Sequence, residues 1–317
     1  MKIVILDGFA SNPGDMSWAE FACFGELTVY PRTPPEKVVS RISDAEIVFL
    51  NKTPITAEVM EQCPRLRMIG ILATGYNIVD TAAAKKRNIT VCNVPGYSTM
   101  AVAQMTFALL LELTQRVGMH AQAVFAGQWQ KNPDFCFWNA PLTELAGKSF
   151  GVVGYGAIGQ AVGRIALAFG MKLLVTSRRE KEVPPGAEFV SLDELLSRSD
   201  VVSLHCPQTA ENLQMINAEA LRKMKPTAIL LNTARGGLVD EAALATALKE
   251  GRLAGYGADV VSREPIAEEN PLLTAPNCVL TPHIAWAPKE TRRRLHRIAA
   301  DNLCAFLAGN PKNVVNP

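Results

Sequence analysis

A glycine-rich turn at residues 154–159 constrains this chain more than any other feature. The apolar run 150–153 leads directly into Gly-x-Gly-x-x-Gly, formed by Gly154, Gly156 and Gly159, and a helix-forming stretch follows. The first glycine of such a turn permits a tight bend, the second lets a pyrophosphate approach the backbone, and the third lets the helix pack on the strand. The helix N-terminus then faces the negative charge of the ligand. The sequence therefore predicts a dinucleotide site whose loop also includes Tyr155, Ala157 and Ile158.

Short apolar runs alternate with helical stretches on both sides of this turn. Alternation of this kind favours an α/β fold with parallel, doubly wound sheets, and a chain of 317 residues suggests about two domains. Thr99 is expected to cap a long apolar helix that ends near Gly118. The expected strands are residues 3–6, 28–30, 47–50, 68–72, 90–92, 150–153, 172–176, 201–204, 228–231, 255–259 and 278–280.

Charge and composition exclude several classes of partner. With 32 basic and 30 acidic residues the net charge is +2, which gives no electrostatic footprint for nucleic acid or an acidic membrane surface. The seven cysteines are scattered without metal-like or redox spacing, which predicts incidental thiols in a reducing cytoplasm and no metal site. The apolar stretch 100–113 is shorter than the ~20 residues of a membrane span, and residues 1–7 show a strand pattern rather than a signal peptide. We therefore expect a soluble, cytoplasmic protein.

The residues that end the second strand of the dinucleotide unit indicate which cofactor is preferred. In NAD sites an acidic residue stands there and binds the ribose 2′-hydroxyl. This chain has Ser177 at that place, followed by Arg178 and Arg179. A hydroxyl and two guanidinium groups offer hydrogen-bond donors and positive charge to a 2′-phosphate. The sequence predicts a preference for NADP(H), with NAD(H) use open; the alternative is that both arginines point to solvent.

Two strand ends in the first hundred residues are candidates for binding a small anion. Lys52 follows the strand 47–50, and Ala73, Thr74 and Gly75 follow the strand 68–72. Ligands of doubly wound sheets lie at the carboxyl ends of strands, and successive backbone N–H groups there can bind an anion. A lysine in such a place is also commonly a solvated surface residue.

Three later strand ends carry residues suited to acid–base chemistry. His283 follows the strand 278–280, Arg235 follows the strand 228–231, and Asp259 and Glu264 follow the strand 255–259. Histidine suits proton transfer near neutral pH, and an acid beside it would stabilise the imidazolium. An arginine can bind a carboxylate through two parallel hydrogen bonds. His205 also ends a strand, while His120 and His296 fall within helical stretches and are expected to be surface or packing residues.

These segments together resemble the D-isomer-specific 2-hydroxyacid dehydrogenase family along the whole chain, and most of all its glycerate dehydrogenase and hydroxypyruvate (glyoxylate) reductase members. The resemblance is carried by residues 72–77, 154–159, 205–207, 232–236, 259–265 and 281–283, which occur in the family's order. It implies reversible hydride transfer between the nicotinamide cofactor and a short 2-oxo or D-2-hydroxy acid. Hydroxypyruvate and glyoxylate, reduced to D-glycerate and glycolate, are the expected substrates.

The resemblance also implies roles for individual residues. Arg235 would bind the substrate carboxylate and carbonyl, His283 would donate the proton, and Glu264 would orient that histidine. The backbone at 73–75 would bind the carboxylate from the smaller domain, and Asp259 would hold the nicotinamide amide; Lys52 stays a substrate-binding candidate from its place at a strand end. Further cofactor contacts are expected at His205, Cys206, Pro207, Thr209, Thr233, Ala234 and Ala285.

The family architecture implies two domains and a dimer. A flavodoxin-like substrate domain would comprise residues 1–98 and 288–317, with a Rossmann cofactor domain, residues 99–287, inserted within it. Family members are commonly homodimers built through the cofactor domain. The aromatic stretch 129–138 fits such an interface, so Trp138 is expected either to pack on a partner subunit or to fill this chain's own core.

Other functions remain open at this point. A D-lactate or phosphoglycerate type of dehydrogenase would share the same residues. A cofactor-sensing corepressor on the same fold would as well, although the chain lacks long polar tails and basic patches. Formate dehydrogenases are disfavoured, because they pair the histidine with glutamine where this chain has Glu264.

Overall fold

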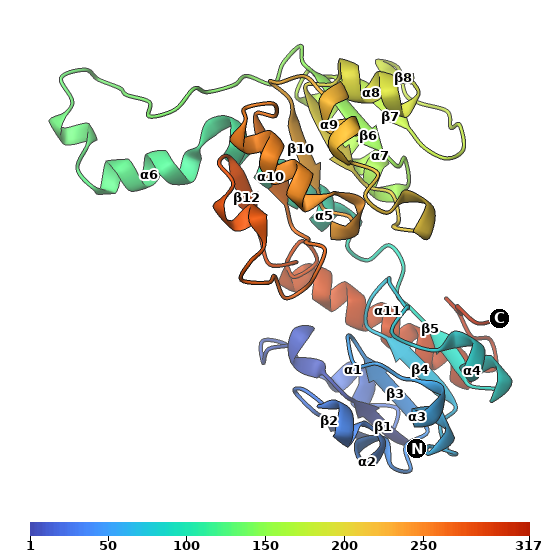
Figure 1. Ribbon diagram of the computed structural model, residues 1–317. Helices are drawn as coiled ribbons and strands as arrows, with labels where there is room; N and C mark the ends of the chain where they lie inside the picture. The colour runs from blue at the N-terminus through green and yellow to red at the C-terminus, as the bar shows by residue number, and fades with distance from the viewer. The chain divides into compact units, whose positions relative to one another are not determined.

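A computed structural model describes residues 1–317 and divides into two compact units (Figure 1). Unit 1 comprises Met1–Ser98 and Trp286–Pro317, and unit 2 comprises Thr99–Ala285. The final segment joins unit 1 at residue 286 rather than at the expected 288. The reason is local: the amide of Ala285 is bonded to Asp259 of unit 2, whereas Trp286 packs on the apolar core of unit 1.

Unit 1 is built on a parallel sheet of five strands in the order β2-β1-β3-β4-β5. Apolar cores lie on both of its faces, which explains why its central strands are continuous apolar runs. The strands are β1 (Lys2–Ile5), β2 (Glu26–Val29), β3 (Ile47–Leu50), β4 (Met68–Ile71) and β5 (Thr90–Cys92). The helices are α1 (Ala19–Ala22), α2 (Val38–Ile42), α3 (Ala57–Glu61), α4 (Thr81–Lys86) and α11 (Lys289–Leu307), with 3-10 turns η1 (Gly8–Ala10) and η2 (Pro35–Lys37).

Unit 2 has a parallel sheet of seven strands in the order β12-β11-β10-β9-β6-β7-β8. The strands are β6 (Ser149–Val153), β7 (Lys172–Thr176), β8 (Ala187–Phe189), β9 (Val201–Leu204), β10 (Ile229–Asn232), β11 (Gly255–Ala258) and β12 (Cys278–Leu280). The helices are α5 (Thr99–Gln115), α6 (Val117–Phe125), α7 (Ala157–Ala168), α8 (Leu192–Arg198), α9 (Ala218–Lys223) and α10 (Glu241–Lys249). Four 3-10 turns complete it: η3 (Trp129–Lys131), η4 (Ala210–Asn212), η5 (Gly236–Leu238) and η6 (Pro271–Thr274).

The strand order of unit 2 reverses beside β6, the strand that leads into the glycine-rich turn. From β6 the chain moves outward to β7 and β8, then returns to β9 on the other side of β6. Doubly wound sheets bind ligands where the strand order reverses in this way. The predicted fold class is therefore confirmed. The sequence did not predict β8, whose Ala-Glu-Phe segment is short and only partly buried.

The long apolar helix ends earlier than expected. It begins at Thr99 itself and ends at Gln115, because Arg116 takes a left-handed backbone conformation with φ 52°. A second helix, α6, starts at once and leads into residues 126–142, which Figure 1 shows extending from the body of unit 2. We call residues 117–142 the arm. Trp138 is 66% exposed, so it does not fill the core of this chain.

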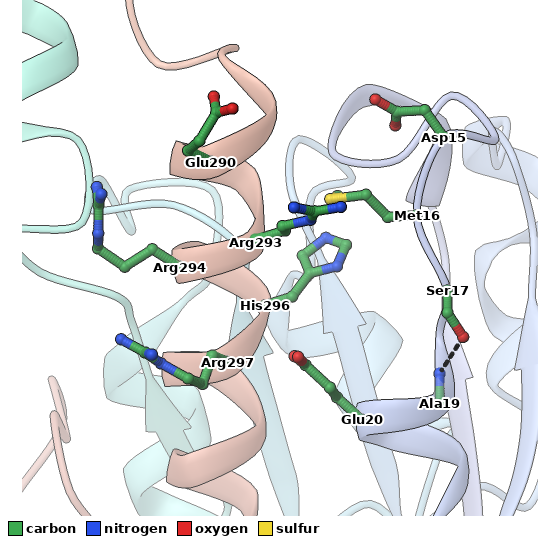
Figure 2. Close-up of a pocket in the computed structure, with 10 residues that line it drawn as sticks. All are labelled: Asp15, Met16, Ser17, Ala19, Glu20, Glu290, Arg293, Arg294, His296 and Arg297. Carbon is green, nitrogen blue, oxygen red and sulfur yellow. Dashed lines mark hydrogen bonds between the residues drawn. The ribbon is translucent and has the colours of Figure 1, made fainter.

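Helix α11 supplies a buried polar cluster to unit 1. His296 is 3% exposed, stacks on Trp18 with ring centroids 4.6 Å apart, and its Nε2 lies 3.0 Å from the hydroxyl of Ser11. One turn earlier, Arg292 bonds both oxygens of Asp15 at 2.7 Å and holds the pKa of that carboxyl at about 2. Figure 2 shows His296 at a cavity of about 740 Å³ between α11 and the segment 15–20.

No helix of the structure combines the length and apolarity that crossing a bilayer requires.

Burial lowers the pKa of His296 to about 4, against about 6.5 for the unfolded chain. Between these pH values the unfolded state binds the extra proton, so the free energy of unfolding falls as the pH drops. We expect His296 to account for about 2 kcal/mol of the stability lost between pH 7 and pH 5. Urea unfolding of the parent and of His296→Gln at both pH values tests this. The prediction is wrong if the difference between the two proteins is the same at pH 7 and pH 5.

Candidate active site and cofactor site

Glycine stands at each of the three positions of the turn for a different structural reason. Gly154 has φ 98°, and a Cβ there would lie 2.5 Å from the backbone nitrogen of Cys206. A Cβ on Gly159 would lie 2.2 Å from the carbonyl oxygen of Gly154, so only glycine lets α7 pack this closely on the turn. A Cβ on Gly156 would meet nothing within 4 Å. Gly154 and Gly159 are thus required by the fold, whereas Gly156 borders open space.

The open space at Gly156 fits a dinucleotide pyrophosphate. Gly156 is the N-cap of α7, and the amides of the first helical turn have no partners within the helix. These amides and the helix dipole form an anion site, and the missing Cβ leaves room for a phosphate to reach them. The donor set and the shape of this turn therefore fit the pyrophosphate of a dinucleotide.

The residues after β7 present cations near this turn. The hydroxyl of Ser177 donates to the carbonyl of Arg179 at 2.6 Å, and both Arg178 and Arg179 are exposed. The structure adds Lys181, which sequence reasoning missed: its ammonium donates to the carbonyl of Tyr155 at 3.0 Å, within the glycine turn. No sequence spacing relates Lys181 to Tyr155, so only the folded chain identifies this contact.

The segment after β9 forms a neutral wall beside Gly154. Burial lowers the pKa of His205 to about 3, so its ring is neutral at physiological pH, and its Nε2 lies 2.8 Å from the hydroxyl of Ser203. Cys206 is half-buried, and its thiol pKa is raised by burial. Pro207 and Thr209 are exposed, with Thr209 capping η4. A neutral wall of this kind adds no charge next to the predicted cofactor site.

Strands β10, β11 and β12 are neighbours, so the segments that follow them lie along one sheet edge. His283 Nδ1 lies 2.7 Å from Glu264 Oε2, and the side chains of His283 and Glu264 are 30% and 35% exposed. His283 also has φ 56°, a left-handed conformation that is uncommon outside glycine and is typical of constrained functional positions. The predicted histidine–carboxylate pair is therefore formed in the structure, and solvent reaches it.

Asp259 fixes the segment that carries His283. Its buried carboxylate accepts hydrogen bonds from the Thr281 hydroxyl at 2.5 Å, the Ile284 amide at 2.9 Å and the Ala285 amide at 2.7 Å. Because a buried carboxylate is stable only with such donors, the loop after β12 is tied to the end of β11. The structure thus shows Asp259 fixing this loop, and its contact with the nicotinamide amide stays a prediction.

Arg235 lies at the same sheet edge as the histidine–carboxylate pair, on the segment after β10. Its guanidinium is exposed and donates to the carbonyl of Ala234 at 2.7 Å. Its backbone is held by Asn232, whose amide side chain donates to the carbonyl of Arg235 and accepts from the amide of Ala234. The neighbouring Thr233 is buried, with its hydroxyl 3.1 Å from that of Thr106. The backbone of this segment is therefore fixed, while the Arg235 fork faces solvent.

In unit 1 the candidate anion-binding segments are joined by side chains that the sequence did not single out. Asp7, just after β1, accepts from the amides of Asn51, Lys52 and Thr53 at 2.6–2.8 Å and from the hydroxyl of Thr53. The ammonium of Lys52 is exposed. Asn51 in turn donates to the carbonyl of Leu72, which links the ends of β3 and β4.

The backbone at 73–75 is held from the β5 side. The amide of Val94 donates to the carbonyl of Ala73, the hydroxyl of Thr74 donates to the carbonyl of Val94, and Asn93 donates to the carbonyl of Thr74. The segment before Gly75 is therefore fixed through its carbonyl groups, which leaves amides at this strand end available for a ligand.

Comparison with known proteins places this architecture in a family. Residues 107–285 match the model of the D-isomer specific 2-hydroxyacid dehydrogenase NAD binding domain. The chain is 52% identical to the hydroxypyruvate reductase of Blautia hydrogenotrophica, with 100% of both chains covered. It is 43% identical to the glycerate dehydrogenase of Methylorubrum extorquens, covering 99% of this chain and 98% of that protein.

Solved structures agree with the sequence relatives. The acyclic imino acid reductase Bsp5, solved in complex with NADPH and D-Arg, superposes with a TM-score of 0.85 at 33% identity, over 99% of this chain and 100% of that one. Full-length similarity of this degree, together with a histidine–carboxylate pair on the same parallel sheet as the glycine-rich turn, identifies the family. The chain belongs to the D-isomer specific 2-hydroxyacid dehydrogenases.

Proposed function

We propose that this enzyme reduces hydroxypyruvate and glyoxylate to D-glycerate and glycolate, with NADPH as the preferred hydride donor. The observation that carries the proposal is the pairing of His283 with Glu264 at a sheet edge that also bears Arg235. The full-length similarity to a hydroxypyruvate reductase and a glycerate dehydrogenase supports the choice of substrate.

The hydrogen bond to Glu264 defines which atom of His283 handles the proton. Nδ1 faces the carboxylate, so it carries a hydrogen there, and we assign the proton exchange with the substrate to Nε2. The carboxylate stabilises the imidazolium, which then donates its Nε2 proton to the carbonyl oxygen of the 2-oxo acid. In the reverse direction neutral Nε2 accepts the proton of the hydroxyl group. The bound nicotinamide supplies or takes up the hydride.

Arg235 is the proposed carboxylate anchor. Its exposed guanidinium offers five N–H donors in a fixed planar array that matches a carboxylate. The single hydrogen bond to the Ala234 carbonyl leaves most of these donors available. The side chain therefore can turn toward a substrate while Asn232 holds its backbone.

Four polar or cationic groups support the NADP(H) preference. Ser177, Arg178, Arg179 and Lys181 lie on the segment after β7, and no acidic residue stands at the strand end. A 2′-phosphate would gain charge-assisted hydrogen bonds there, whereas a bare 2′-hydroxyl would gain little. Lys181 already reaches the glycine turn, which brings its ammonium to the cofactor side of this segment.

We also propose that the enzyme is a homodimer assembled through the arm. Phe125 is 89% exposed and Phe135 is 88% exposed, and with Trp138 they place three large apolar side chains on one projection of unit 2. The arm is internally ordered, since Trp129 bonds the carbonyl of Phe135 and Asn139 bonds His120. An ordered segment with exposed aromatic residues is typical of an interface.

Replacing His283 tests the acid–base role. Proton donation by a placed side chain contributes about 10²–10⁴-fold, so His283→Ala is expected to lower kcat by at least ~10². The NADPH dissociation constant, measured by fluorescence titration, is expected to stay within about twofold of the parent value, because the glycine turn is untouched. A kcat within threefold of the parent would show that His283 is not the proton donor.

Replacing Arg235 tests substrate anchoring. Arg235→Ala is expected to raise KM for hydroxypyruvate by tenfold or more, since a hydrogen bond to a charged group contributes about 1.5–3 kcal/mol. Arg235→Lys keeps the charge without the planar array and should give an intermediate KM. Arg252, which pairs with Glu250 on the surface of unit 2, supplies the matched control, and Arg252→Ala should leave KM unchanged. An unaltered KM in Arg235→Ala would refute the assignment.

The cofactor preference is tested by steady-state rates with both cofactors. We expect kcat/KM to be at least tenfold higher with NADPH than with NADH. The variant Arg178→Ala/Arg179→Ala should lose that advantage while its rate with NADH stays near the parent value. Lys172 begins the same strand at its opposite end, so Lys172→Ala is the control. An enzyme that favours NADH would contradict the proposal.

A further inference from the structure

The loop that carries Glu264 has little to hold it by burial. Val260 is buried at its start, but Ser262, Arg263, Glu264 and Pro265 are all exposed. Within the loop, the Val261 amide lies 3.4 Å from Glu264 Oε1, a long hydrogen bond. An exposed loop of this kind needs polar contacts from elsewhere if Glu264 is to stay 2.7 Å from His283.

Glu241, the first residue of α10, supplies those contacts. Its Oε1 accepts from the amide of Ser262 at 2.7 Å, and its Oε2 accepts from the hydroxyl of Ser262 at 2.7 Å. The same Oε2 accepts from the side chain of Asn270 at 2.8 Å, and Asn270 is buried and caps η6. Both carboxylate oxygens are therefore engaged in fixing the loop against rigid elements.

Gly236 determines how close this loop lies to the Arg235 segment. A Cβ on Gly236 would lie 1.9 Å from the carbonyl carbon of Val261 and 2.3 Å from the amide nitrogen of Ser262. The two backbones are thus in direct contact. Ser262 is also held from the α10 side, because its amide donates to the carboxylate of Glu241. The position of the loop is set from two directions.

Arg235 does not depend on Glu241 in the same way. Its backbone is held by Asn232, at the end of β10, through hydrogen bonds to residues 234 and 235. Loss of the Glu241 carboxylate therefore affects the Glu264 loop more than the substrate anchor. This difference separates an effect on proton transfer from an effect on substrate binding.

We propose that Glu241 is a positioning residue of the active site, which holds the Val261–Glu264 loop so that Glu264 stays against His283. The inference rests on the acid–base roles given to His283 and Glu264 under the proposed function. Glu241 itself touches neither the substrate nor the cofactor in this scheme. Its contribution passes entirely through Glu264.

A double-mutant cycle in the full-length enzyme tests this inference. Glu241→Ala is expected to lower kcat about tenfold, because small displacements of a catalytic group cost rate steeply, while KM for hydroxypyruvate changes by less than threefold. In a Glu264→Ala background the same substitution should change kcat by less than twofold, since residues that act through one another are not additive. Ser262→Ala, which removes one exposed hydroxyl, should show the same pattern with a smaller effect, so the test survives if Glu241→Ala folds poorly.

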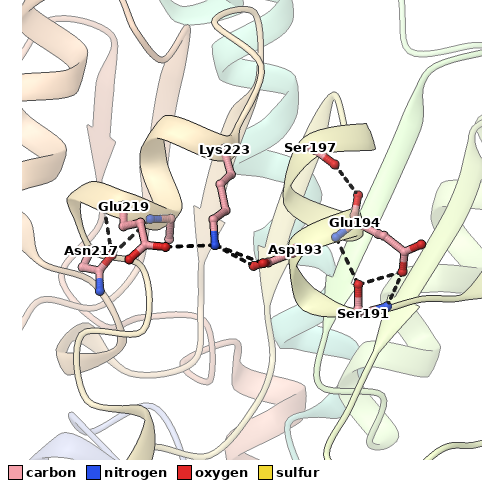
Figure 3. Close-up of polar contacts among 8 residues, drawn as sticks. Ser191, Asp193, Glu194, Ser197, Asn217, Glu219 and Lys223 are labelled. Atoms are coloured by element: carbon pink, nitrogen blue, oxygen red, sulfur yellow. Dashed lines mark hydrogen bonds and ion pairs between the residues drawn. The ribbon is translucent and has the colours of Figure 1, made fainter.

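Glu219 provides the matched control. It lies in the first turn of α9, as Glu241 lies in the first turn of α10, but it pairs only with Lys223 of its own helix (Figure 3). Glu219→Ala should leave kcat at the parent value. Hydrogen exchange gives a readout without turnover: amides of residues 260–266 should exchange faster in Glu241→Ala and not in Glu219→Ala.

The outcomes separate this inference from the proposed function. If Glu264→Ala lowers kcat but Glu241→Ala lowers it equally in both backgrounds, Glu241 has only a general structural role and the inference is wrong. An unchanged kcat in Glu241→Ala also overturns it. If Glu264→Ala itself leaves kcat unchanged, the proposed acid–base pair is wrong, and the role of Glu241 falls with it.

Discussion

The arrangement of both units depends on carboxylates that lie just beyond a parallel strand and accept hydrogen bonds from the loop after the neighbouring strand. Asp259, after β11, fixes the loop of His283 after β12, and Asp7, after β1, fixes the loop of Lys52 after β3. Parallel strands bring such loops to one edge but do not fix them, because loop amides have no partners in the sheet. A carboxylate with several donors provides that fixation without a buried apolar side chain. The loops that carry Lys52 and His283 are thereby held to the ends of the neighbouring strands.

Local patterns were sufficient to predict the fold class and the glycine turn. Strands buried on both faces appear as continuous apolar runs, and the glycines at 154 and 159 are dictated by backbone contacts that any turn of this type must make. Because residues after neighbouring parallel strands converge at one edge, the sequence also predicted an acid near His283; the resemblance to the family, not the spacing, favoured Glu264 over Asp259. Strand ends agree with those expected or differ by one residue, except that β2 begins two residues earlier; such differences are usual where hydrogen bonding rather than apolarity defines the boundary.

The features that could not be predicted from the sequence depend on contacts between distant residues or on unusual backbone conformations. Arg116 ends α5 in a left-handed conformation for which arginine gives no signal, so the sequence did not predict that α5 ends at residue 115 and that α6 follows it directly. Lys181 and Glu241 act on segments 26 and 21 residues away, and nothing in their surroundings distinguishes them from surface charges. The sequence likewise gives no indication that Asp7 accepts hydrogen bonds from residues 51–53. The direction of the Arg235 side chain depends on a hydrogen bond to its own neighbour's carbonyl.

At Gly156 the requirements of the fold and of the ligand are separate, whereas in many proteins one residue has to meet both. No atom of the protein occupies the place where a side chain would project from this glycine, so the polypeptide itself would tolerate a methyl group there. In the proposed cofactor site, only the pyrophosphate would need that space. A substitution at position 156 would therefore affect coenzyme binding and leave the fold intact. Evolution could thus change the ligand at this position without destabilising the protein.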